Sequence, residues 1–211
     1  MASRPPTRSV KISADERTGW SSDRPRGDGA PARPANLAVH CRVLAPADRL
    51  RYSPGSLLIV VSAAPEVREG FLERLIEDRA SLLSPEKVRG LLRGRVAAEE
   101  LEQRAQELLG AAVRKRLESR ETVVLGTGVR PEDREEFVRL ASQLRRPRHL
   151  ILLETAREKV PEEDHATLNE LRRALDGGEL GGEGLQTVLR LSPVSASEVK
   201  RILFRPPPRE D

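Results

Sequence analysis

The segment Leu57–Glu77 places eight residues, Ser62–Glu69, at the point where an apolar strand is expected to turn into a helix. A turn that binds nucleotide phosphates reads Gly-x-x-x-x-Gly-Lys-Ser/Thr. Its glycines let backbone N–H groups converge on the phosphates, its lysine neutralises charge, and its hydroxyl binds Mg²⁺. Aligned without gaps, this chain places Ser62, Arg68 and Glu69 at the first glycine, the lysine and the hydroxyl. These three are the candidate cofactor-binding residues.

Most positions of this turn are unsuited to phosphate. Ser62 and Val67 replace both glycines, and a β-branched residue disfavours a close backbone approach. Pro65 has no N–H to offer. Glu66 and Glu69 add two negative charges, whose repulsion of a triphosphate is on the order of several kcal/mol at an effective dielectric near 20. Arg68 alone keeps the required charge.

The surrounding chain alternates between apolar runs and amphipathic stretches, a pattern typical of a parallel sheet covered by helices. Strands are expected at Leu37–Leu44, Ser56–Ser62, Ser81–Leu83, Thr122–Leu125, His149–Leu153 and Leu185–Leu191. Helices are expected at Glu66–Arg79, Pro85–Leu92, Ala97–Arg120, Pro131–Leu144 and Pro161–Leu175, with a last one from the capping box Ser195–Glu198 through Leu203. The predicted fold class is α/β, with three layers and a mostly parallel sheet.

Three segments together resemble a known family. They are Asp48–Ile76, Ser84–Leu92 and Arg114–Ala141. Their pattern is similar to that of the P-loop kinases related to polynucleotide 5′-kinase, which include AAA-type and zeta-toxin-like ATPases. The resemblance covers roughly residues 46–204 and implies a P-loop NTPase-like domain over residues 37–204.

The same resemblance implies roles for residues elsewhere in the chain. Glu86 aligns with the aspartate that serves these kinases as general base, and it is the candidate catalytic residue. Gly126 and Gly128 stand where the family carries the Asp and Thr of an Asp-x-Thr turn. Arg157, within the short segment Ala156–Pro161, is the candidate remnant of an arginine-bearing lid. The fold-forming features are kept while the residues of phosphoryl transfer are replaced.

The first hypothesis is therefore a pseudokinase, a catalytically degenerate P-loop kinase-like protein with a binding or regulatory role and no cofactor. A second is a divergent phosphotransferase acting on a nucleic acid or nucleotide 5′-hydroxyl. It would use ATP and Mg²⁺, with Arg68 as clamp and Glu86 as base. A third is a nucleic-acid-binding module with an Arg-rich surface that includes Arg145, Arg146 and Arg148. The replaced turn favours a protein that is not an enzyme.

Composition bounds the remaining properties. One cysteine excludes an internal disulfide, and the scattered histidines do not suggest a metal site. No apolar run is long enough to cross a membrane, so a cytoplasmic protein is expected, with a protein or nucleic acid as partner. Residues 1–36 are predicted to be a disordered basic tail, and residues 205–211 a Pro-rich tail.

Overall fold

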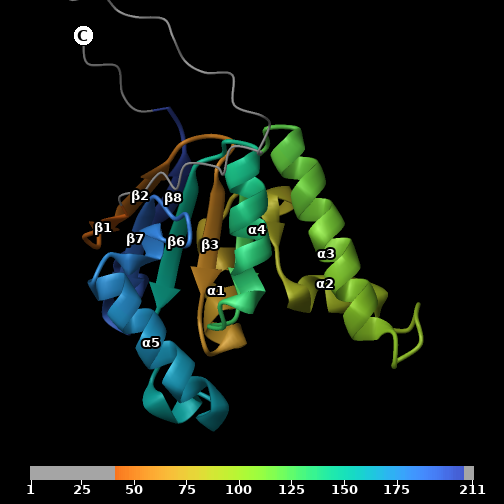
Figure 1. Ribbon diagram of the computed structural model, residues 1–211. Coiled ribbons are helices and arrows are strands. Elements are labelled where there is room, and N and C mark those ends of the chain that lie inside the picture. Colours follow the sequence, from red (N-terminus) through yellow and green to blue (C-terminus); the bar gives the residue numbers. More distant parts are fainter. Residues whose placement is uncertain (1–40, 207–211) are drawn as a thin grey trace, which may run out of the picture. The chain divides into compact units, whose positions relative to one another are not determined.

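The computed structural model describes residues 41–206 (Figure 1). The tail predicted over residues 1–36 lies outside this range, as do residues 207–211. Six parallel strands form the main sheet in the order β1-β7-β6-β3-β5-β4. Their bounds are β1 Arg42–Leu44, β3 Leu57–Val61, β4 Leu82–Leu83, β5 Val123–Thr127, β6 Arg148–Leu153 and β7 Thr187–Leu191. The prediction of an α/β domain with a parallel sheet is confirmed.

Strand β3 lies between β5 and β6 and is completely buried. Its five residues are all apolar, as a strand covered on both faces requires. The chain leaves β3 for β4 and returns to β5, then crosses to β6 and β7 on the other side of β3. Ligands of such sheets bind beyond the carboxyl ends of the strands, near the strand where this direction reverses.

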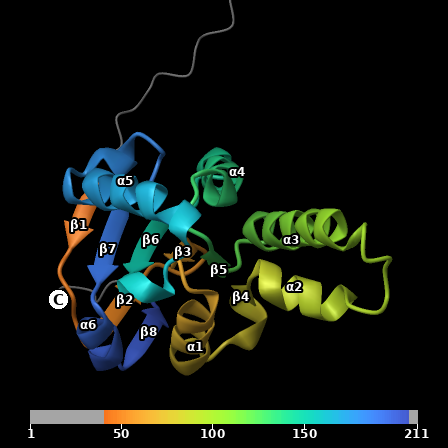
Figure 2. The same ribbon diagram turned by 90° about the horizontal axis from the view of Figure 1, so that it is seen from below.

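Helices cover both faces of the sheet (Figure 2). On one face, Leu57, Ile59 and Val61 of β3 share a core with four helices. The four helices are α2 Pro85–Leu92, α3 Leu101–Glu118, α4 Glu132–Gln143 and α5 His165–Asp176. On the other face, Leu58 and Val60 pack with α1 Pro65–Leu75 and with residues around α6 Pro193–Glu198. The alternation of side chains along β3 therefore separates two cores, as the pleat of a strand dictates.

The prediction for the last helix is wrong. Helix α6 ends at Glu198, and residues 201–204 form strand β8 (Arg201–Phe204), which pairs in parallel with β2 (Arg49–Tyr52). The helix also begins earlier than the capping box suggests, because the Ser192 side chain caps it and accepts a hydrogen bond from the Ser195 backbone N–H. The apolar residues assigned to a helix face instead lie in a short strand, with Ile202 buried beside β2.

Strand β2 was not predicted, whereas the remaining main-sheet strands and helices fall close to their predicted positions. Ser84 caps α2 as expected, since its hydroxyl accepts a hydrogen bond from the Lys87 N–H at 3.3 Å. Short 3-10 turns that the patterns did not indicate flank α5, at Glu162–Asp164 and Glu179–Gly181. Residues 37–40 of the first predicted strand lie outside the described range. Within residues 41–206, no helix has the length and apolar character needed to cross a membrane.

Candidate functional site

The turn between β3 and α1 is short and closed. Only Ser62, Ala63 and Ala64 separate the strand from Pro65, the first residue of the helix. The Ser62 hydroxyl accepts a hydrogen bond from the Ala64 N–H at 3.2 Å. The backbone N–H groups of Val67 and Arg68 both donate to the Ala64 carbonyl, each at 3.2 Å. These three N–H groups are therefore engaged within the turn, and Pro65 contributes none.

The Arg68 side chain is turned into the protein and is only 1% exposed. One terminal nitrogen, Nη1, donates to the Thr127 carbonyl at 2.6 Å, and the other, Nη2, forms a 2.7 Å ion pair with Glu86 Oε2. Nε lies 3.5 Å from Glu69 Oε1. The guanidinium thus binds the end of β5 and two carboxylates. A buried charge requires such partners. The Thr127 carbonyl accepts from Nη1, and the ion pair with Glu86 compensates the charge that would otherwise attract a phosphate, although Nη2 itself makes no hydrogen bond with good geometry among the described residues.

Gly126 makes room for this arginine. A Cβ atom at position 126 would lie 3.0 Å from Arg68 Nε, 3.2 Å from Arg68 Cδ and 3.2 Å from Leu72 Cδ1. The glycine therefore has a steric reason that the sequence alone did not reveal. The resemblance expects an aspartate here and a lysine in place of Arg68. This chain instead carries a residue without a side chain beside a long side chain that fills the space.

Glu86 lies in the first turn of α2, where its carboxylate faces two arginines. Oε2 pairs with Arg68, and Oε1 lies 3.9 Å from Arg89 Nη1. The side chain is 31% exposed, so solvent reaches part of it. A general base needs an oxygen within hydrogen-bonding distance of the proton that it removes. Oε2 of Glu86 lies in the ion pair with Arg68, which stabilises the carboxylate and weakens it as a base.

Arg157 is not part of this cluster. It is exposed and begins the 3-10 turn Arg157–Lys159, and it lines a cavity against α5. The structure thus brings four of the five predicted site residues into one region: Ser62, Arg68, Glu69 and Glu86. Ser62 is linked to the others through β5, since its backbone N–H lies 3.4 Å from the carbonyl oxygen of Thr127, to which Arg68 also donates.

A cavity of about 330 Å³ adjoins the other side of α1, where β6 ends. Its lining includes Val67, Phe71, Leu153 and Pro193, and it extends to α6. Arg74 lies at its edge and donates from Nη1 to the Val199 carbonyl at 2.6 Å. Sequence reasoning missed this cavity. The only signal was the spacing of Val67, Phe71 and Arg74 along one side of α1.

His149 has a structural role at the start of β6. Nδ1 lies 2.8 Å from Thr187 Oγ1, and the ring packs on Tyr52 with 4.7 Å between the ring centroids. Burial, with a smaller contribution from the charge of Arg148, lowers the pKa of His149 to about 4. The neutral form is therefore the stable one in the folded protein at neutral pH. Over residues 41–206, no group of three or more His, Cys, Asp or Glu side chains is placed to hold a metal ion.

The arginine run before β6 divides into buried and exposed members. Arg148 is only 6% exposed, and its Nη1 donates to the Arg146 carbonyl at 2.8 Å. Arg146 in turn donates from Nε to the Leu117 carbonyl at 3.1 Å. Arg145 is exposed. Two of the three guanidinium groups therefore hold segments of the fold together.

In comparisons with known proteins, the sequence matches no protein-family model and no curated protein.

Proposed function

We propose that this chain is a pseudokinase, a P-loop kinase-like protein that uses its fold for binding or regulation and does not transfer phosphate. The observation that carries the proposal is the position of Arg68. The one basic side chain left in the turn is buried and is bound by Thr127, Glu86 and Glu69. A phosphate would have to displace a 2.7 Å ion pair and a 2.6 Å hydrogen bond to reach it.

Two further features support the same conclusion. Three N–H groups of the turn donate within it, and the glutamates at positions 66 and 69 place negative charge at the start of α1, where the helix dipole would otherwise attract an anion. Gly126, where the resemblance expects an aspartate, also accommodates Arg68. This packing supports a turn that is closed to phosphate.

A calorimetric titration with ATP and GTP, each with and without Mg²⁺, tests this proposal. The proposal predicts no saturable, Mg²⁺-dependent binding with a dissociation constant below about 100 μM. Binding tighter than that, weakened by Arg68→Ala, would instead favour the divergent phosphotransferase. The next step would be to incubate the protein with labelled ATP and an oligonucleotide bearing a 5′-hydroxyl, with Glu86→Gln as the variant that tests the base.

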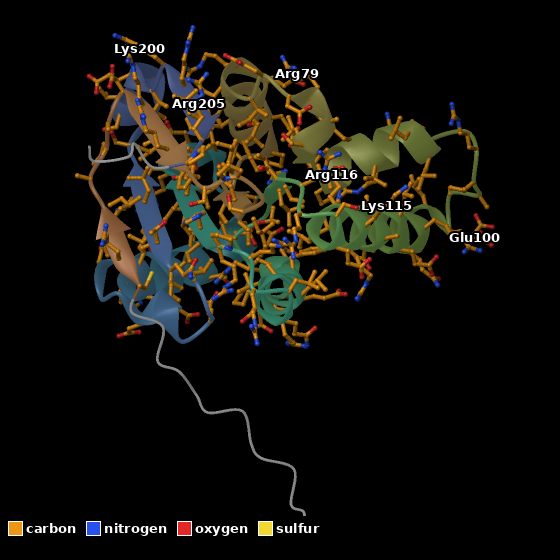
Figure 3. All side chains as sticks on the ribbon, turned by 90° about the horizontal axis from the view of Figure 1, so that it is seen from above. Arg79, Glu100, Lys115, Arg116, Lys200 and Arg205 are labelled. Atoms are coloured by element: carbon orange, nitrogen blue, oxygen red, sulfur yellow. The ribbon has the colours of Figure 1, made fainter. Side chains whose placement is uncertain are left out.

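The nucleic-acid-binding alternative has less support from the arrangement of arginines. Lys115 and Arg116 lie in the last turn of α3 (Figure 3). Arg116 Nη2 lies 3.1 Å from Glu121 and 3.9 Å from Asp78, so its charge is compensated. Together with the buried Arg148, this leaves fewer free cations than the composition suggests. Binding to an oligonucleotide that weakens steeply between about 50 and 200 mM salt would support this alternative.

A further inference from the structure

A second cavity, of about 360 Å³, lies between the segment that follows β6 and one side of α5. Its polar lining comes from Thr155, Arg157, His165, Asn169 and Arg172, and its apolar lining from Val160 and Leu168. Two arginines and a histidine thus face the cavity, and no carboxylate does. Ser62, Arg68, Glu69 and Glu86 do not line this cavity. The inference therefore does not depend on the function proposed above.

Arg172 is held in a fixed orientation at the wall of this cavity. Its Nε donates to Glu154 Oε1 at 2.9 Å, Nη2 also binds Glu154, and Nη1 donates to Asn169 Oδ1 at 2.9 Å. Arg190 Nε lies 2.7 Å from the same Glu154. Burial opposes ionisation of Glu154, but hydrogen bonds and charges from both arginines lower its pKa below the usual value. The carboxylate is therefore ionised and orients the guanidinium.

The ion pairs around the cavity leave one arginine without a partner. Arg172 and Arg190 share Glu154, and Arg190 also lies 3.1 Å from Asp176. These two arginines and two carboxylates sum to zero. Arg157 forms no ion pair with the described residues, so its guanidinium is available to a ligand, although the exposed carboxylate of Glu162 also lies near the cavity. His165 Nε2 lies 3.6 Å from Glu162 and supplies a further nitrogen at the rim.

Thr155 supplies an unused hydroxyl. Its Oγ1 is shielded from solvent and has no hydrogen-bond partner among the described residues. A buried hydroxyl without a partner costs about 1–3 kcal/mol, a cost that a bound acceptor would remove. Thr155, Arg157 and Arg172 line the same space, so a rotation of the Thr155 side chain would bring its hydroxyl to a ligand held by the arginines.

We propose that this cavity binds a small anion with several oxygens, a phosphate or carboxylate group of a small molecule. The guanidinium fork of Arg157 matches the paired oxygens of both groups, and charge-assisted bonds of this kind are stronger than neutral ones. The volume suits a small molecule. Arg157 binds the anion from the solvent side. Arg172, whose side chain is 27% exposed, binds it from the α5 side through the N–H groups that Glu154 and Asn169 do not use. The Thr155 hydroxyl donates to the anion once its side chain rotates toward the cavity.

A thermal-shift titration with inorganic phosphate at constant ionic strength, with chloride as the replaced anion, tests the site. The midpoint should rise in a saturable way. Arg157→Gln should weaken the apparent affinity by about tenfold and Thr155→Val by roughly threefold. Arg139→Gln removes the same charge from an exposed position on α4 and should bind like the unaltered protein. Both arginines are exposed, so neither change should unfold the protein.

A parallel titration with succinate identifies the group that is preferred. Tighter binding of phosphate indicates a phosphate-bearing ligand, and tighter binding of succinate a carboxylate. Either result, lost in Arg157→Gln, supports the site. The proposal is overturned if neither anion shifts the midpoint beyond chloride up to on the order of 50 mM. It is equally overturned if Arg157→Gln and Arg139→Gln weaken binding to the same extent.

Discussion

Replacement of Gly126 by alanine tests whether Arg68 fills the space at the end of β5. The added Cβ would lie 3.0 Å from Arg68 Nε, and Arg68 is fixed by Thr127 and Glu86. Glycine in a strand interior is itself unfavourable by about 0.5–1 kcal/mol relative to alanine, so without the contact the change would stabilise the fold. With the contact, overpacking should lower the free energy of unfolding by about 1–3 kcal/mol.

Urea denaturation of single and double variants measures this effect. Gly70→Ala is the matched control, because a Cβ at position 70 meets no atom within 4 Å, and alanine in helix α1 should stabilise by up to about 1 kcal/mol. Arg68→Ala should itself cost about 2–4 kcal/mol, since it removes the hydrogen bond to the Thr127 carbonyl and the ion pair with Glu86. In that background Gly126→Ala should lose most of its cost, a coupling of about 1–2 kcal/mol.

Two results would refute this reasoning. In the first, Gly126→Ala would be tolerated as well as Gly70→Ala. In the second, Gly126→Ala would cost the same with and without Arg68, so that the two positions would not be coupled. Either result would mean that Arg68 does not fill the space beside Gly126. The explanation of the closed turn by the contacts of Arg68 with Thr127 and Glu86 would then fail.

Three further predictions concern other parts of the fold. Arg134 is 2% exposed and binds both oxygens of Glu183 at 2.9 Å, so Arg134→Met should cost about 2–4 kcal/mol in urea denaturation, and a cost under about 0.5 kcal/mol would contradict this role. Because the pKa of His149 falls to about 4 on folding, the unfolded chain binds the extra proton. Between pH 7.5 and 5 the protein should therefore lose about 2 kcal/mol more stability than His149→Asn, and equal losses would refute the assignment. Arg120 lies just after the C-cap of α3 with φ of 61°, so Arg120→Gly should raise the unfolding midpoint by an amount equivalent to about 0.5–1 kcal/mol, whereas Arg114→Gly inside the helix should lower it.

Much of the fold was predictable because its strongest patterns are local. The run Leu57–Val61 is apolar at every position and forms the central strand, and Ser84 followed by Pro85 marks the start of α2. The strand β8 was not predictable in this way. Its residues, 201–204, lie just after a capping-box pattern, and their strand conformation depends on pairing with β2, about 150 residues earlier in the chain.

The candidate site was predictable in its location but not in its bonding. Parallel strands end at one edge of the sheet, and this rule predicted that Ser62, Arg68 and Glu86 lie in one region. The sequence did not reveal that Arg68 turns inward, because its rotamer is decided by Thr127 and Glu86, which lie on other elements. Position 126 looked like a lost aspartate, and only the packing of Arg68 explains why a glycine is present.

The most direct test of the closed turn is an amide NMR titration of the protein with ATP and Mg²⁺, followed at Gly126 and at residues 62–69 other than Pro65. These positions report on the turn itself, so binding in the cavity beside α5 would be recognised by shifts elsewhere. If Arg68, Glu86 and Thr127 close the site, these amide signals should show no saturable shift up to millimolar nucleotide. Saturable, Mg²⁺-dependent shifts at these amides would contradict the account and would show that the turn still binds a nucleotide.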